Sequence, residues 1–166
     1  MQAKRLLCLL VFLALCLSLV GCKPREYIYC EVGITLPRSY RPFDASGEYD
    51  LAFRDGDTVI GVRRISFDAA IKEGILATHS PLKFAEIYRD RVVGEGDAVM
   101  REHGDIPYFS YTRVTSSGTY VYTPAFFRTP YAYFILILVT ENSLQVGECV
   151  AFLDICDTFR ILPEYV

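Results

Sequence analysis

The sequence contains no tryptophan and only two histidines, His79 and His103. A hydrolytic site needs a base beside a nucleophile, and no Gly-x-Ser-x-Gly turn supplies such a nucleophile here. Zinc sites need Cys and His residues at short spacings, and the sequence has no such cluster. We therefore predict no catalytic residues, no metal site and no cofactor. A hydrolase that uses His79 or His103 remains the alternative.

The sequence also lacks an excess of basic residues. It carries 17 Lys and Arg against 20 Asp and Glu, which gives a formal net charge of −3. Affinity for nucleic acid comes largely from neutralisation of phosphates, so this balance argues against a nucleic-acid partner. There is no Gly/Ser-rich linker and no internal repeat. These absences predict one globular domain, which we expect over residues 27–166.

The longest apolar run stands at the N-terminus. Lys4 and Arg5 precede it, it extends over residues 6–20, and Gly21-Cys22 follows. This is the layout of a secretory signal peptide, and about 15 apolar residues are fewer than the about 20 that span a bilayer. The cysteine at the end resembles the lipobox of bacterial lipoproteins, which implies that Cys22 is lipidated and becomes the mature N-terminus.

This resemblance predicts a signal peptide at residues 1–21, a short tether at 22–26 and a lipid anchor on Cys22. Two acyl chains suffice for stable anchoring, so we expect the protein on the extracytoplasmic side of the cell membrane. Plain secretion and an uncleaved anchor are the alternatives.

Three cysteines follow the proposed lipid site: Cys30, Cys149 and Cys156. The last two are seven residues apart in a predicted helix, which separates them by about 10.5 Å. A disulfide needs Cα atoms within about 7 Å, so these two cannot pair with each other. Cys30 can pair with Cys149 or with Cys156, and otherwise all three are buried thiols. A thiol-based redox role is a third, weaker functional alternative.

Strand and helix signals follow one another along the whole domain. Ser80-Pro81 is typical of a helix start, and Asp55-Gly56 is typical of a hairpin turn. The patterns predict strands at 27–32, 49–53, 58–67, 98–102, 108–114, 119–127, 132–140 and 159–162, and helices at 68–73, at 81–93 and from Asn142 or Ser143 onward.

Two of these segments indicate how the elements pack. Residues 132–139 are apolar without alternation, so that strand must be covered on both faces. The last helix carries a predicted apolar stripe of Val146, Cys149, Val150, Leu153 and Cys156. The predicted fold class is therefore α+β, an antiparallel sheet flanked by helices on both faces in an α/β/α sandwich.

Tyrosines gather in the predicted strands between residues 108 and 133. Tyrosine packs well across strands, and it also provides amphipathic contact area in binding surfaces. We name as the candidate binding face Tyr108, Tyr111, Tyr120 and Tyr122. A purely structural role for these rings is the alternative.

The order of the elements resembles the Mog1/PsbP-like group of α/β/α sandwich domains. The likeness is carried by Gly33-Ile34-Thr35-Leu36-Pro37, by the helix with Phe84-Ala85-Glu86-Ile87-Tyr88, and by Ile106-Pro107-Tyr108-Phe109-Ser110-Tyr111. The group consists mostly of binding or assembly factors. The resemblance therefore implies a lipid-anchored, non-catalytic binding or assembly module near the membrane surface, with a protein or small-molecule partner.

Overall fold

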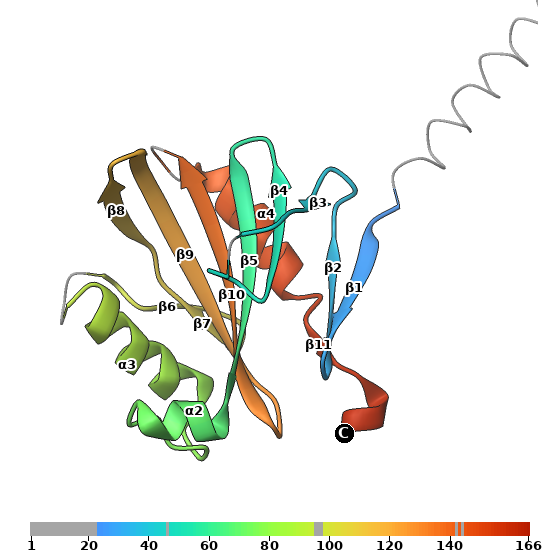
Figure 1. Ribbon diagram of the computed structural model, residues 1–166, viewed down its shortest axis with the longest axis vertical. Helices are drawn as coiled ribbons and strands as arrows, with labels where there is room; N and C mark the ends of the chain where they lie inside the picture. The colour runs from blue at the N-terminus through green and yellow to red at the C-terminus, as the bar shows by residue number, and fades with distance from the viewer. Residues whose placement is uncertain (1–22, 46, 95–97, 142, 144) are drawn as a thin grey trace, which may run out of the picture.

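The computed structural model describes residues 23–45, 47–94, 98–141, 143 and 145–166. The expected signal peptide and Cys22 lie outside these residues. The described chain is built on an eight-stranded sheet in the order β3-β4-β5-β10-β9-β7-β6, with β8 also paired to β9 (Figure 1). Its strands are antiparallel throughout: β3 (Arg41–Pro42), β4 (Leu51–Asp55), β5 (Thr58–Ser66), β6 (Arg101–His103), β7 (Ile106–Tyr108), β8 (Tyr111–Thr115), β9 (Gly118–Arg128) and β10 (Ala132–Glu141).

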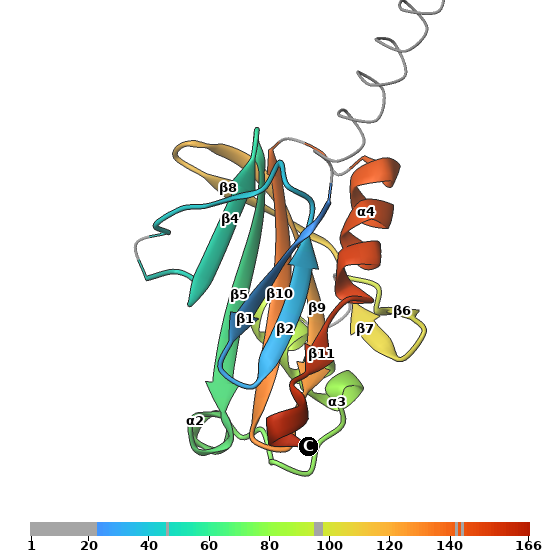
Figure 2. The ribbon, with the colours of Figure 1, turned by 90° about the vertical axis from the view of Figure 1, so that its right-hand side faces the viewer.

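A second, smaller sheet and three helices cover the main sheet. The small sheet has the order β1-β2-β11 and lies with α4 on one side of the main sheet (Figure 2). Helices α2 and α3 lie on the opposite side (Figure 1). These elements are β1 (Arg25–Tyr29), β2 (Val32–Leu36), β11 (Arg160–Ile161), α2 (Phe67–Lys72), α3 (Pro81–Val92), α4 (Val146–Cys156) and a short 3₁₀ helix at Pro163–Tyr165.

Strand β10 is the centre of the core and is buried from Ala132 to Thr140. Its side chains alternate between two apolar clusters. Phe134 and Leu136 pack with the small sheet and α4, whereas Tyr133 and Ile135 pack with α2 and α3. The prediction that this uniformly apolar strand is covered on both faces of the sheet is therefore confirmed.

The covering layers differ from the prediction in one respect. The α+β class and the antiparallel main sheet are confirmed, but one face is covered by strands as well as by a helix. The β2 side chains Val32, Ile34 and Leu36 are buried in the same cluster as Phe152 of α4. The apolar residues of the small sheet thus fill much of the space that a purely helical layer would occupy.

Two predicted strands are interrupted by turns. The strand expected at 27–32 is the β1–β2 hairpin, whose turn contains Cys30 at a φ of 51°. Its first strand starts at Arg25, inside the expected tether. The strand expected at 108–114 is divided between β7 and β8, because Phe109 and Ser110 belong to neither. Neither interruption contains a glycine, the residue that most clearly marks a turn, so local sequence signals did not predict them.

The predicted buried stripe of the last helix is wrong in its first half. Helix α4 begins at Val146 with Gln145 as its N-cap, not Ser143, and Asn142 lies outside the described residues. Val146 is 82% and Val150 is 53% exposed. The buried residues cluster in the second half: Phe152, Leu153, Ile155 and Cys156. In the first half of the helix, Cys149 is partly buried against the core, whereas Val146 and Val150 are not covered.

A buried ion pair joins the two sheets. The Glu31 carboxylate, in the β1–β2 turn, accepts hydrogen bonds from Arg64 Nε at 3.0 Å and from Thr129 Oγ1 at 3.0 Å. Arg64 belongs to β5, and Thr129 lies in the β9–β10 turn. Burial alone would raise the pKa of Glu31, but these hydrogen bonds hold it below its usual value.

Candidate functional site

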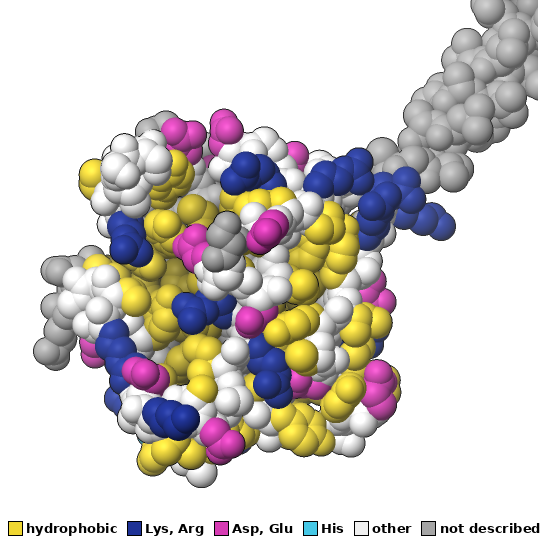
Figure 3. Space-filling model, in the orientation of Figure 1, with side chains coloured by type: hydrophobic (Ala, Val, Ile, Leu, Met, Phe, Trp, Pro, Cys, Tyr) yellow, Lys and Arg dark blue, Asp and Glu magenta, His cyan; other side chains and the backbone are white. Residues whose placement is uncertain are grey.

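A cleft of about 530 Å³ opens on the face of the main sheet that carries α2 and α3. Figure 1 shows why: the two helices lie over one end of the sheet and leave the end near β8 uncovered. The surface here is hollowed, with apolar side chains inside and basic side chains beside it (Figure 3). The lining residues are Glu48, Tyr49, Arg63, Tyr88, Val92, Tyr111, Thr112, Arg113, Tyr122 and Ile137.

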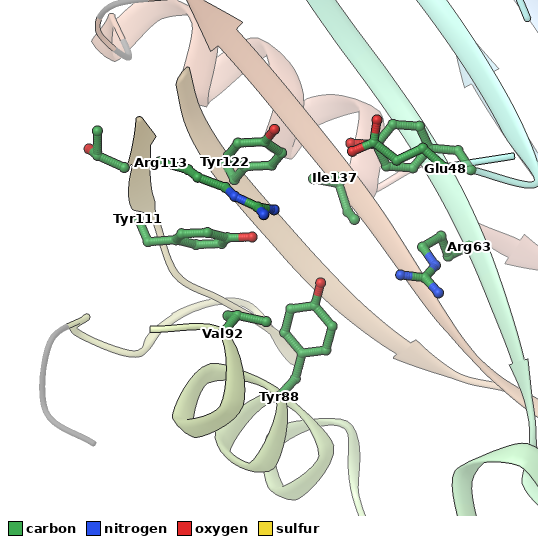
Figure 4. A pocket seen from close by; sticks show the side chains of 10 residues that line it. Glu48, Arg63, Tyr88, Val92, Tyr111, Arg113, Tyr122 and Ile137 are labelled. Carbon is green, nitrogen blue, oxygen red and sulfur yellow. The ribbon is translucent and has the colours of Figure 1, made fainter. Parts of the chain in front are cut away.

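Strand pairing places two tyrosines side by side in this cleft. Tyr111 of β8 is the register partner of Tyr122 of β9. Their rings stack with centroids 5.3 Å apart and planes at 17°. Alternation along β8 puts Arg113 on the same face as Tyr111. One wall of the cleft is therefore a rigid aromatic pair with a guanidinium group beside it (Figure 4).

The ring of Tyr49 can pack into the cleft because the β5 residue that it contacts, Gly61, has no side chain. A Cβ atom on Gly61 would overlap the Tyr49 ring, far inside van der Waals contact. The adjacent residue fixes the segment, because Asp50 donates from its backbone N–H to the Val62 carbonyl at 2.9 Å. A glycine inside a strand is typical of such a close approach.

The tyrosine hydroxyls in the cleft are held in their protonated form. Burial raises the pKa of Tyr88 and of Tyr111. Burial likewise raises the pKa of Tyr122 and, together with neighbouring Glu48, that of Tyr49. These groups therefore act as neutral hydrogen-bond donors at physiological pH and are poor general bases.

A second hollow of about 570 Å³ continues the first. The two share Glu48, Tyr49, Arg113 and Tyr122. The second hollow also contains Tyr120 and Arg54, and the Arg54 guanidinium lies 4.5 Å from the centre of the Phe43 ring. We call the two hollows together the tyrosine cleft.

The structure brings together three of the four tyrosines named from the sequence. Tyr111, Tyr120 and Tyr122 line the tyrosine cleft. Tyr108 does not, since it is only 9% exposed and packs in the opposite core with α4 and the small sheet. Tyr108 and Tyr111 are three residues apart, and residues an odd number of positions apart along a strand point to opposite faces of the sheet. Its inclusion in the candidate face was wrong.

Both histidines lie outside the cleft. His79 Nδ1 accepts a hydrogen bond from the Leu76 backbone N–H at 3.2 Å. His103 Nε2 lies 3.0 Å from Asp157 Oδ2. The hydrogen bonds of the described residues connect neither imidazole to a serine or cysteine side chain. The adjacent hydroxyl, on Ser80, instead accepts from the Lys83 backbone N–H as a helix cap. The geometry gives no support to a hydrolytic pair.

The cysteines after Cys22 are free thiols. Cys30 is exposed in the β1–β2 turn, whereas Cys149 is half-buried and Cys156 buried in α4. Figure 2 shows that this turn lies toward the end of the molecule that carries α2, and that α4 lies in the other half. The disulfide from Cys30 to Cys149 or Cys156 is therefore not formed. Burial raises the pKa of both helix thiols, which makes them weak nucleophiles.

The part of the chain described by the structure contains no group of three His, Cys, Asp or Glu residues able to hold a metal ion. It also contains no helix of the length and hydropathy needed to cross a bilayer.

Five charged or aromatic lining residues of the first hollow were not identified from the sequence: Glu48, Tyr49, Arg63, Tyr88 and Arg113. They come from a loop, two strands and a helix that are distant in the sequence, so no local motif connects them. The one available signal was Gly61, a glycine inside a β-branched strand.

Comparison with known proteins places the fold. A protein from Bacteroides thetaiotaomicron matches 84% of this chain with 13% identity and a TM-score of 0.58, and the chain spans about half of that protein, 49%. The Ran-binding protein Mog1p of Saccharomyces cerevisiae matches 85% of this chain and 96% of its own, with 11% identity and a TM-score of 0.56. A cyanobacterial PsbP from Synechocystis matches 83% of this chain and 92% of its own, with 15% identity and a TM-score of 0.49.

No family model and no curated protein matches the sequence. At these identities the structural matches show the fold alone. The Mog1-like fold expected from the sequence is confirmed.

Proposed function

We propose that the protein is a lipid-anchored binding module of the cell envelope, and that the tyrosine cleft is where it binds its ligand. The observation that carries the proposal is the cleft itself, an open concave surface with rigid aromatic walls and polar groups that converge on it. Its hydroxyls are neutral donors, and the lining residues that the structure describes include no histidine or cysteine. This chemistry suits recognition rather than catalysis.

The fold supports a binding role of this kind. Mog1p, which shares the fold, is named for binding another protein, Ran. Residue identities are too low for any of its contacts to be carried over. The support is therefore limited to the kind of role, a non-catalytic binding or accessory factor.

The anchor would place the cleft close to the membrane. Strand β1 begins at Arg25, three residues after Cys22, and three extended residues reach about 10 Å. In Figure 1 the end of the molecule at which β1 begins also carries the β4–β5 and β8–β9 turns, which border the uncovered part of the sheet. A ligand at or near the membrane surface would thus be within reach.

Metabolic labelling tests the anchor. Radiolabelled palmitate should enter the wild-type chain, and the chain should sediment with membranes. Cys22→Ser should lose the label and be released from the membrane fraction, because the acceptor thiol is gone. Cys30→Ser is the matched control and should keep both properties, since Cys30 lies in the β1–β2 turn. Labelling of Cys22→Ser at the wild-type level would refute lipidation at this residue.

Site-specific photo-crosslinking tests the cleft. A benzoylphenylalanine at position 120, on the cleft, should give a discrete adduct in living cells. The same group at position 165, in the 3₁₀ helix and away from the cleft, should not give that adduct. The adduct should also disappear when Arg113→Gln is added. Equal adducts from both positions would refute a binding role for the cleft.

A further inference from the structure

Two arginines in the tyrosine cleft have no carboxylate partner among the residues that the structure describes, in contrast to four arginines elsewhere in the chain. Arg64, Arg89, Arg91 and Arg160 each form an ion pair with an Asp or Glu. Arg63 and Arg113 form no hydrogen bond or ion pair with any residue that the structure describes. They extend from opposite walls, β5 and β8, and their guanidinium groups face each other across the cleft (Figure 4). Two like charges facing one hollow favour an anion between them.

The neutral hydroxyl groups around the two arginines are also suited to bind an anion. The hydroxyls of Tyr88 and Tyr111 point into the space between the arginines (Figure 4), and their raised pKa values keep them as donors. Among the described lining residues of this hollow, the acidic one is Glu48, on the Arg63 side. The hollow thus presents many donors and a net positive lining, which matches the acceptor oxygens of a carboxylate or phosphate.

The volume and the lining of the hollow indicate the kind of molecule to which the anionic group belongs. A hollow of about 530 Å³ is in the range of small-molecule sites. Its apolar surface comes from the Tyr111–Tyr122 stack together with Val92 and Ile137. We propose that the tyrosine cleft binds a small organic molecule through an oxyanion, carboxylate or phosphate, held between Arg63 and Arg113, with a flat apolar part against the tyrosine stack. This inference rests on the proposed binding role of the cleft.

Calorimetric titration of the full chain in a non-ionic detergent tests the inference. The probes are phenyl phosphate and benzoate, with benzyl alcohol as the neutral analogue and benzylamine as the cationic one. Benzyl alcohol and benzylamine should bind at least about tenfold more weakly than the better oxyanion, because the neutral alcohol cannot form an ion pair or a bidentate hydrogen bond with a guanidinium group and the ammonium group is repelled by it. The two oxyanion probes also distinguish phosphate from carboxylate as the preferred group. Added salt should weaken the binding of either oxyanion.

Substitutions locate the binding. Arg63→Gln and Arg113→Gln should each weaken oxyanion binding about tenfold or more, about 1.4 kcal/mol, while the far-UV circular dichroism remains that of the wild type. Arg101→Gln, which removes an exposed arginine of β6 outside the cleft, should leave the affinity unchanged.

Three outcomes would overturn the inference: benzyl alcohol binding as tightly as the oxyanions, Arg113→Gln binding as tightly as the wild type, or no binding of either oxyanion. None of these outcomes would refute the proposed function, which the crosslinked adduct at position 120 tests independently of the probes.

Discussion

At the scale of single residues, the contact between Gly61 and Tyr49 determines the shape of the cleft. Gly61→Ala would place a methyl group inside the Tyr49 ring, so the ring must move away from the sheet. We expect the free energy of unfolding to fall by about 1–3 kcal/mol, a usual range for overpacking. Urea denaturation followed by circular dichroism measures this change.

Gly147→Ala is the matched control for this substitution. Gly147 lies in α4, and an added Cβ there meets no described atom within 4 Å. Alanine costs less backbone entropy than glycine in a helix, so the free energy of unfolding should rise by about 0.5–1 kcal/mol. A Gly61→Ala variant that was no less stable than the wild type would contradict the close contact at Gly61.

The hydroxyl group of Tyr27 provides a second prediction about stability. It is buried and has no hydrogen-bond partner among the described residues, while its ring packs on Phe53 at 4.5 Å. Tyr27→Phe removes an unsatisfied polar group and keeps the ring. The free energy of unfolding should therefore stay the same or rise, by up to about 1 kcal/mol.

Tyr133→Phe provides the contrast. The Tyr133 hydroxyl lies 2.7 Å from the Leu76 carbonyl oxygen and 2.8 Å from that of His79, to which it donates. Removing it takes the donor from two partly buried carbonyl groups and should lower the free energy of unfolding by about 1–2 kcal/mol. Chemical denaturation of both phenylalanine variants in parallel checks the pair. A larger loss in Tyr27→Phe than in Tyr133→Phe would contradict the assignment.

At the scale of elements, helix α3 positions Tyr88 at the cleft and depends on its N-cap. The Ser80 side chain accepts a hydrogen bond from the Lys83 backbone N–H at 3.2 Å. Ser80→Ala should lower the free energy of unfolding by about 1 kcal/mol, and Ser80→Asp should restore most of that loss, because aspartate caps equally well. Thermal or urea unfolding checks the series. A Ser80→Asp variant no more stable than Ser80→Ala would contradict the capping role.

The elements with strong local signals were predictable from the sequence. The cap of α3 follows from Ser80-Pro81, and the burial of β10 on both faces follows from its unalternating apolar run. Both depend on chemistry within a few residues. The same is true of the β4–β5 turn at Asp55-Gly56-Asp57.

The elements whose form depends on distant partners were not predictable. The turn at Cys30 lacks a glycine and is fixed by Glu31, whose partners Arg64 and Thr129 are far away in the sequence. The buried side of α4 depends on how much of the helix reaches the core. The cleft itself depends on α3 leaving part of the sheet uncovered, which no local pattern reports.

At the scale of the whole molecule, the buried Glu31 joins the small sheet to the main sheet and should make stability depend on pH. The pKa of Glu31 is lower in the folded chain than its usual value of 4.5. The stabilisation is therefore present above about pH 4.5 and is lost as the pH falls through the lower, folded pKa.

Two glutamate variants isolate this contribution. At pH 7, Glu31→Gln should lower the free energy of unfolding by about 1–3 kcal/mol, and the difference from the wild type should shrink in acid. Glu26→Gln is the control, because Glu26 pairs with Arg160 on the exposed surface and should change stability by less than about 1 kcal/mol. Urea unfolding at pH 7 and pH 3 makes the comparison. An undiminished difference at pH 3 would contradict the account.

The buried Glu31–Arg64 ion pair connects the small sheet to the main sheet. The open cleft with Arg63 and Arg113 lies on the main sheet. Tyrosine-selective ¹³C NMR of the full chain during titration with phenyl phosphate and benzoate tests the cleft as the binding site most directly. The ring signals of Tyr88, Tyr111 and Tyr122 should shift with a common saturation curve, while those of Tyr27 and Tyr165 stay in place. Saturable shifts confined to tyrosines outside the cleft would contradict the account.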